Sequence, residues 1–162
     1  MLRLCAAITT SMVACLAASE LCAATATGHA SVTILRAIMA SETAPMSFGQ
    51  LGPPSGGGAV ALSPTSGITG PPGLGVAGTA AAGKFTVTGQ PSSAVTISFS
   101  SGNVLAGPGP AMALGSFVHN AGATPALDGS GTLTFSVGAT LAIGAAQPPG
   151  SYSGTYAVTV NY

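Results

Sequence analysis

Apolar residues and small polar residues alternate in short segments along most of this 162-residue chain. The clearest example is the final segment, 150–162, in which apolar side chains recur at every second position: Tyr156, Val158, Val160 and Tyr162. Side chains two positions apart lie on the same face of a β-strand, so a period of two predicts a strand with one apolar face. We therefore expect these four side chains to face a core. Such a terminal strand either closes a sheet of its own domain or pairs with a partner.

The same alternation predicts eight or nine short strands in all. Turns rich in Gly, Pro and Ser separate them, in a chain with 24 Gly and 12 Pro. This spacing favours an all-β fold: a two-sheet antiparallel, immunoglobulin-like sandwich or a barrel. We interpret the Gly/Pro-rich segment at about 64–83 as a surface loop of this single domain. The expected strands besides the last lie at 31–34 (extending to about 40), 46–51, 59–63, 84–88, 94–100, 111–118, 132–137 and 140–143.

The amino-terminal residues have the pattern of a cleaved secretory signal peptide. Arg3 precedes a largely apolar run at 4–16, and small residues follow it. We expect a signal-peptide helix in residues 1–24, with cleavage after Ala24 or Ala26. The domain at 25–162 would then be exported to the periplasm, the cell surface or the medium. No later stretch is long and apolar enough to span a membrane.

All three cysteines, Cys5, Cys15 and Cys22, lie in this leader, so the mature domain would have no disulfide. Cys22 raises the alternative of a lipoprotein, whose lipid is attached at the cleavage point. Glu20 fits that processing site poorly, so we favour ordinary cleavage.

Charge is scarce: three basic and three acidic residues make up 4% of the chain, against about 25% in ordinary soluble domains. Two interpretations stay open. Ser and Thr solvate an exported domain, or the surface packs against other copies, since little charge repels them. Nucleic acid is not an expected partner, because no cluster of Lys or Arg could meet phosphates.

Two glycine-rich motifs resemble nucleotide-binding loops. Gly73, Gly75 and Gly78 match the dinucleotide pattern, but no strand precedes them and no helix follows. The segment from Gly78 to Lys84 approaches a phosphate-binding loop, but Phe85 stands where a hydroxyl must bind magnesium. We interpret both as chance matches.

Few other residues could act as catalytic acids, bases or nucleophiles. His119, Asp128 and Glu42 are too sparse for a triad or a carboxylate pair, and no nucleophile motif accompanies them. We interpret His119 as a solvated loop residue. The sequence therefore predicts no catalytic, cofactor or metal site, and a protein that is not an enzyme.

Several segments together resemble the exported bacterial family catalogued as domain of unknown function 4402. They are the strand with Val32 and Ile34, the Met-Ser-Phe-Gly-Gln-Leu segment at 46–51, and the segments 85–89, 127–138 and 149–162. The resemblance covers essentially the whole mature chain and implies no established activity.

A more distant similarity is to subunits of chaperone–usher pili, particularly the spore-coat-U-like kind. It rests on Phe48-Gly49 and on the Tyr-containing terminal strand, although the cysteine pair common in those pilins is missing. The resemblance implies an incomplete sandwich completed by a neighbour's amino-terminal strand. Ala30, Val32 and Ile34, on one face of the segment 25–35, would form that donor strand or pair within their own domain. Partners would then be other copies, related subunits and a periplasmic chaperone.

Two hypotheses for function follow. The first is an exported, non-enzymatic structural or surface-interaction protein of fimbrial type. The second is a secreted β-sandwich module that binds carbohydrate or another surface ligand through the 64–83 loop. Exposed aromatic side chains would support the second, but the chain has no Trp and few aromatic residues outside the expected strands, which favours the first.

Overall fold

The computed structural model describes residues 24–53 and 55–162 of the chain. The expected signal peptide falls on residues 1–23 and lies outside the described part. The chain divides into two units, Met1–Thr33 and Ile34–Tyr162. In the first unit, the described residues 24–33 are assigned neither helix nor strand. All the strands found in the described residues belong to the second unit.

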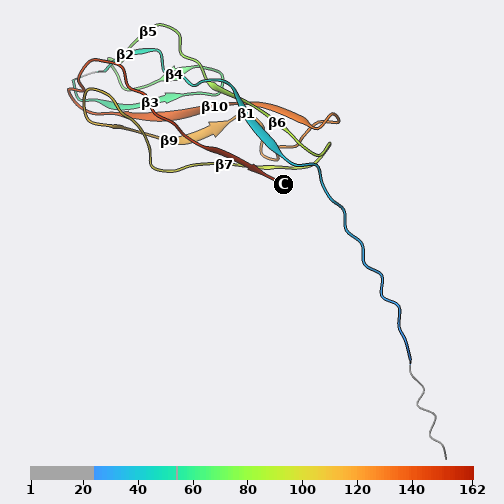
Figure 1. The fold of residues 1–162 in the computed structure, drawn as a ribbon. Coiled ribbons are helices and arrows are strands. Elements are labelled where there is room, and N and C mark those ends of the chain that lie inside the picture. Colours follow the sequence, from blue (N-terminus) through green and yellow to red (C-terminus); the bar gives the residue numbers. More distant parts are fainter. Residues whose placement is uncertain (1–23, 54) are drawn as a thin grey trace, which may run out of the picture. The chain divides into compact units, whose positions relative to one another are not determined.

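The second unit is all-β and every strand pairing in it is antiparallel, as the alternation predicts (Figure 1). Its largest sheet has seven strands. Five follow the order β1-β6-β10-β3-β4, while β9 pairs with β10, and β8 with β9. They are β1 (Met39–Ala44), β3 (Gly58–Leu62), β4 (Ile68–Thr69), β6 (Gly83–Thr88), β8 (Asn103–Leu105), β9 (Met112–His119) and β10 (Thr132–Ile143). Two smaller sheets each have two strands: β7 (Thr96–Phe99) with β11 (Val158–Asn161), and β2 (Gln50–Gly52) with β5 (Gly75–Ala77).

The twelve-residue strand β10 is the centre of the large sheet. Its first half pairs with β6 and its second half with β3, and β9 lies along its other edge. The two strands expected at 132–137 and 140–143 are therefore one. Gly138 lies at the junction of the two halves. Glycine is needed there, because a Cβ at this position would collide with the carbonyl oxygen of Leu62. The period of two continues through the glycine, so the odd-numbered residues from 133 to 143 share one face.

Two apolar clusters lie against that face of β10. The first contains Phe135 and Val137 of β10 together with Val160 of β11, and Ile97 and Phe99 of β7 pack against it. The small β7–β11 sheet thus covers this half of the large sheet, and Figure 1 shows β7 and the C-terminal end of the chain running alongside each other. The second cluster contains Leu141 and other buried side chains around the second half of β10. Among the described residues, no strand of the β7–β11 sheet contributes to the second cluster.

Three expectations about strands need correction. The first strand begins at Met39, not near Ser31, and the described residues 24–38 form no strand. The segment 64–83 is not a plain loop, since it contains β4 and β5. The terminal strand is short: β11 covers only Val158–Asn161 of the segment 150–162. Pro148 and Pro149, which cannot donate to a strand ladder, lie in the irregular part before it.

Candidate binding groove

An open groove of about 710 Å³ lies over the second apolar cluster. Its floor comes from β8, β9 and β10. One wall is the segment 46–53 and the other is the segment 147–154, with Tyr156 at one end. The floor consists of Leu105, Met112, Leu114, Leu141 and Ile143.

The first wall is held by main-chain pairing. The main chain of Ser47 exchanges two hydrogen bonds of 2.8 Å with Ala81, and β2 pairs with β5. Gly49 between them has a φ of 73°, and a Cβ there would come within 3.0 Å of the carbonyl oxygen of Ala77. Glycine is therefore required at this close approach. On its other edge, no strand pairing is found for β2 within the described chain.

The second wall is held in the same way. Ser153 and Ala106 exchange hydrogen bonds of 2.8 and 2.9 Å, the one bridge found between Gly144 and Ala157 in this described stretch. Gly154 packs directly on the carbonyl oxygen of Val104, where a Cβ would collide. The Tyr152 hydroxyl donates to the Pro148 carbonyl oxygen at 2.9 Å. Both walls are thus anchored by main-chain contacts to neighbouring segments.

The groove carries no formal charge in the described part of the chain. No Asp, Glu, Lys, Arg or His is among its described lining residues. Its polar groups are amides, hydroxyls and main-chain groups, and its floor is aliphatic. A preformed site of this size and character suits an uncharged, largely apolar occupant. Among these described lining residues there is no carboxylate, imidazole, amine or thiol to activate the Ser and Tyr hydroxyls.

The sequence matches the protein family described as Domain of unknown function (DUF4402) over residues 38–162. This chain belongs to that family. The match begins one residue before β1 and covers every strand of the described structure. No curated protein and no solved structure matched the chain.

The DUF4402 domain places the four predicted core residues of its last segment in different surroundings. Val160 is buried and Val158 packs beside it in the first cluster. Tyr156 is half-buried and touches both clusters. Tyr162 is 42% exposed and lies outside β11, and its hydroxyl is bonded to the main chain of Arg36 and Gln90.

Tyr156 separates the groove from the first cluster. Its ring stacks on Phe117 with centroids 5.1 Å apart and meets Phe85 edge-on at 6.1 Å. Its hydroxyl oxygen is buried with no hydrogen-bond partner in the described residues, directly over Gly83. Burial, with a smaller effect of the charge on Glu42, raises the pKa of Tyr156 to about 12. The phenol therefore stays neutral at physiological pH.

The predicted pairing residues Ala30, Val32 and Ile34 lie before the family match. Val32 is 85% exposed and Ile34 is 88% exposed, and Ala30 is exposed as well. They belong to no strand in the described structure. The chain thus has an apolar alternating segment that none of its described strands pairs with.

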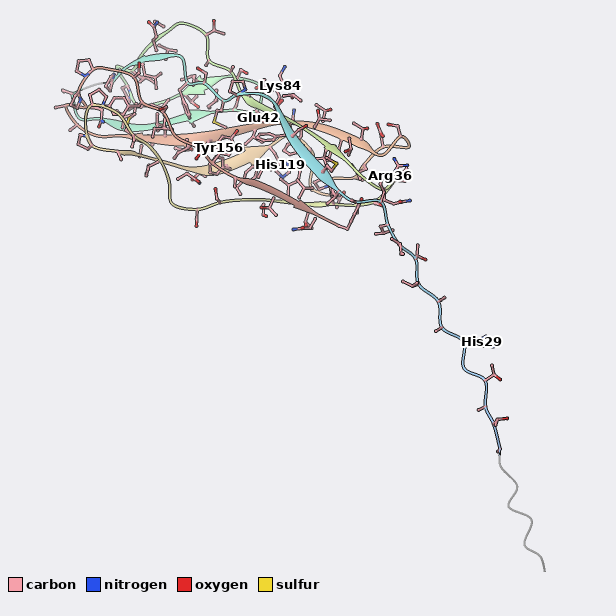
Figure 2. All side chains as sticks on the ribbon, viewed as in Figure 1. His29, Arg36, Glu42, Lys84, His119 and Tyr156 are labelled. Atoms are coloured by element: carbon pink, nitrogen blue, oxygen red, sulfur yellow. The ribbon has the colours of Figure 1, made fainter. Side chains whose placement is uncertain are left out.

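The remaining chemical candidates are dispersed. Figure 2 shows Arg36 at one end of the domain, while Glu42, Lys84 and His119 lie on β1, β6 and β9. Asp128 makes hydrogen bonds within its own turn. In the described part of the chain, no group of three His, Cys, Asp or Glu could hold a metal ion, and no helix is long and apolar enough to cross a membrane.

His119 needs correction, because it is not a solvated loop residue. It ends β9, and its half-buried ring lies about 6 Å from the rings of Phe99 and Phe135. The two glycine-rich segments lie among strands in the described structure. The segment 73–78 contains β5 and no helix, and Lys84 is followed by the rest of β6.

Sequence reasoning missed the groove itself. Its walls are separated by about a hundred positions in the chain, and alternation gives faces but not neighbours. Pro148-Pro149-Gly150 is a sequence feature that could have indicated one wall of the groove. Consecutive prolines cannot form a paired strand, so this segment is expected to be irregular.

Proposed function

We propose that this DUF4402 protein is an exported, non-enzymatic structural or surface-interaction protein that works as a fimbrial-type subunit. Residues 1–24 direct export and are removed after Ala24 or Ala26. The mature chain then assembles with other copies or related subunits in the periplasm or at the cell surface, after binding a periplasmic chaperone. The β7–β11 sheet and the large sheet are the two layers of an immunoglobulin-like sandwich.

One observation carries this proposal: the exposed apolar face of the segment before β1. Val32 and Ile34 expose 85% and 88% of their surface in a segment that alternates as a strand does. Exposed apolar surface of this kind is typical of a protein–protein contact, and an extended segment can add to the open edge of a sheet. The 4% charge content means that little repulsion opposes the packing of many copies.

The test is the oligomeric state of the mature chain beginning at Thr25, measured by light scattering after gel filtration. We expect concentration-dependent oligomers. The double variant Val32→Asp with Ile34→Asp should be monomeric, because two charges cannot enter an apolar interface. The matched control, Ser31→Asp with Thr33→Asp, adds the same charge to the opposite face and should still assemble. A wild-type chain that is folded and monomeric at all concentrations contradicts the proposal.

A further inference from the structure

The amino terminus that export would create has a histidine at its third position. The segment 24–26 is Ala-Thr-Ala, which has the small-residue pattern of a signal-peptide cleavage site. Cleavage after Ala26 leaves Thr27, Gly28 and His29 as the first three residues of the mature chain. The inference drawn from these residues rests on the proposed function, because it needs the chain to be exported and cut at this site.

The described structure leaves the main chain of this segment open to a ligand. Residues 24–33 form neither helix nor strand, and Gly28 and His29 are exposed. A Cβ at Gly28 would meet nothing within 4 Å. Within the described residues, no main-chain hydrogen bond involves the N–H of Gly28 or of His29. Figure 2 shows the extended backbone around His29. Binding at these nitrogens would therefore break no strand pairing.

The three residues would present four nitrogens that one metal ion can bind in a plane. They are the α-amine of Thr27, the main-chain nitrogens of Gly28 and His29, and Nδ1 of the His29 ring. A metal site built from side chains needs several of them, whereas this chelate needs only one, because main-chain nitrogens supply the rest. A square-planar set of nitrogen ligands selects Cu²⁺ or Ni²⁺, and Cu²⁺ binds more tightly than the other divalent metals of its row. Zn²⁺ gains nothing from a planar site, since it has no geometric preference of its own.

We propose that the mature chain binds one Cu²⁺ ion at its amino terminus through Thr27, Gly28 and His29. Four bonds from copper to nitrogen form, and the ion remains Cu²⁺, the form expected in an oxidising exported compartment. The amide protons of Gly28 and His29 and one proton of the terminal ammonium group pass to the solvent. A bound cation is the largest local charge at such a site and can deprotonate its own ligands. Protons therefore compete with the metal, so binding should strengthen as the pH rises.

The test begins with the full chain, expressed in a bacterial host and purified after export. The intact mass of the product identifies its first residue, which we expect to be Thr27. Titration with CuCl₂ then measures the number of ions bound, followed by circular dichroism in the visible region, where only a bound metal absorbs. We expect one Cu²⁺ per chain. Electron paramagnetic resonance should show a square-planar copper site with nitrogen ligands, and ZnCl₂ in equal amount should not displace the copper.

Three variants separate this chelate from an ordinary exposed imidazole. His29→Ala removes the ring, while Gly28→Pro keeps the ring and removes one main-chain N–H. Loss of a group that only hydrogen-bonds to a metal ligand costs about 10–100-fold in metal affinity, so loss of a ligand itself should cost about a hundredfold or more in both variants. His119→Ala is the control, since it removes the other of the two histidines, whose Nδ1 already accepts a bond from Ala121 N at 3.3 Å. It should bind copper as the wild type does, and the intact mass checks that every variant is cut at the same residue.

The outcomes distinguish the copper site from the proposed function. A product that begins at Thr25 overturns the copper site and leaves export and assembly standing, and so does a product that begins at Thr27 but binds no copper. Equal affinity of the wild type and Gly28→Pro assigns the metal to an imidazole alone and also overturns the site. A monomeric product with one bound Cu²⁺ contradicts the fimbrial-type subunit and supports the site. A product that retains residues 1–26 contradicts both.

Discussion

The hydroxyl of Tyr162 donates a hydrogen bond of 2.7 Å to the main-chain carbonyl of Arg36, a residue 126 positions earlier. The same oxygen accepts a bond of 2.6 Å from the main-chain N–H of Gln90, whose side chain in turn accepts from Arg36 N at 3.3 Å. Gly89 makes room for this contact, since a Cβ there would collide with the hydroxyl. The last residue thus fixes the point from which the chain leads into β1.

The variant Tyr162→Phe should loosen this point. It removes two hydrogen bonds, so that water must bind the Arg36 carbonyl and the Gln90 N–H instead. We expect a loss of about 1 kcal/mol in the free energy of unfolding. Amide hydrogen exchange at residues 35–37 should become faster, while exchange in β10 stays slow. Denaturant unfolding and exchange measured by mass spectrometry check both expectations. Tyr156→Phe is the control, and faster exchange at 35–37 in that variant would contradict the role given to Tyr162.

Tyr162 also shows where sequence patterns stop being informative. Alternation placed Val160 on the core side, and Val160 is buried, because the period of two continues through β11. It wrongly placed the Tyr162 ring in the same row, since the strand ends at Asn161 and the hydroxyl bonds to groups elsewhere in the chain. Single-strand patterns contain no record of such long-range partners.

For the fold and the groove too, local residue patterns predict some features, while others depend on contacts between distant parts of the chain. The all-β class and the positions of β3, β6 and β9 followed from local residues. The union of two expected strands into β10 could not be predicted in this way, because a glycine between two alternating segments indicates a turn. Only the folded chain shows that Gly138 lies against the carbonyl oxygen of Leu62 within one strand. The groove depends on walls near Leu51 and Tyr152 and on their unpaired edges, which are properties of the assembled sheets.

Val160→Ala should show that β11 closes the first cluster. Val160 is 8% exposed and packs against the cluster around Phe135. Removing two buried methyl groups should cost about 2 kcal/mol of unfolding free energy. Thr159→Ala, on the exposed side of the same strand, is the matched control and should change stability by less than about 0.5 kcal/mol. Equal effects of the two substitutions, measured by urea unfolding, would contradict the placement of Val160 on the buried face of β11 and Thr159 on its exposed face.

Gly83 and Tyr156 should be energetically coupled. A Cβ at Gly83 would collide with the Tyr156 hydroxyl, so Gly83→Ala should cost about 1–3 kcal/mol. Tyr156→Phe removes a buried hydroxyl that has no partner in the described structure, so it should be neutral or slightly stabilising. In the Tyr156→Phe background, Gly83→Ala should cost less.

A double-mutant cycle by urea unfolding measures this coupling. Gly115→Ala provides the control, because Gly115 also lies in a strand, β9, and a Cβ there would meet nothing within 4 Å. Strict additivity of Gly83→Ala and Tyr156→Phe would show that the hydroxyl is not what excludes a side chain at position 83.

Tyr156 should also make stability depend on alkaline pH. Its pKa in the fold is about 12, against an ordinary value of 10.0. Because the folded pKa is the higher one, the neutral phenol favours the folded state, fully below about pH 10 and progressively less as the pH rises towards 12. Absorbance titration at 295 nm should show a tyrosinate component near pH 12 that Tyr156→Phe removes. If that variant loses as much unfolding free energy between pH 10 and 12 as the wild type does, the raised pKa does not belong to Tyr156.

Asp128 should make stability depend on acidic pH in the opposite sense. One of its carboxylate oxygens accepts bonds from the Ser130 hydroxyl at 2.6 Å and from the main-chain N–H groups of Ser130 and Thr132 at 2.9 and 2.8 Å. These bonds, with the Ser130 hydroxyl first, lower the pKa of Asp128 below its ordinary 3.8. A depressed folded pKa stabilises the fold above the unfolded value, so this stabilisation is present above about pH 4 and is lost as the pH falls further. Asp128→Asn keeps an acceptor oxygen but cannot titrate, so its unfolding free energy should fall less between pH 4 and pH 2 than that of the wild type. Identical acid profiles of the two proteins would show that the turn does not depend on the charge of Asp128.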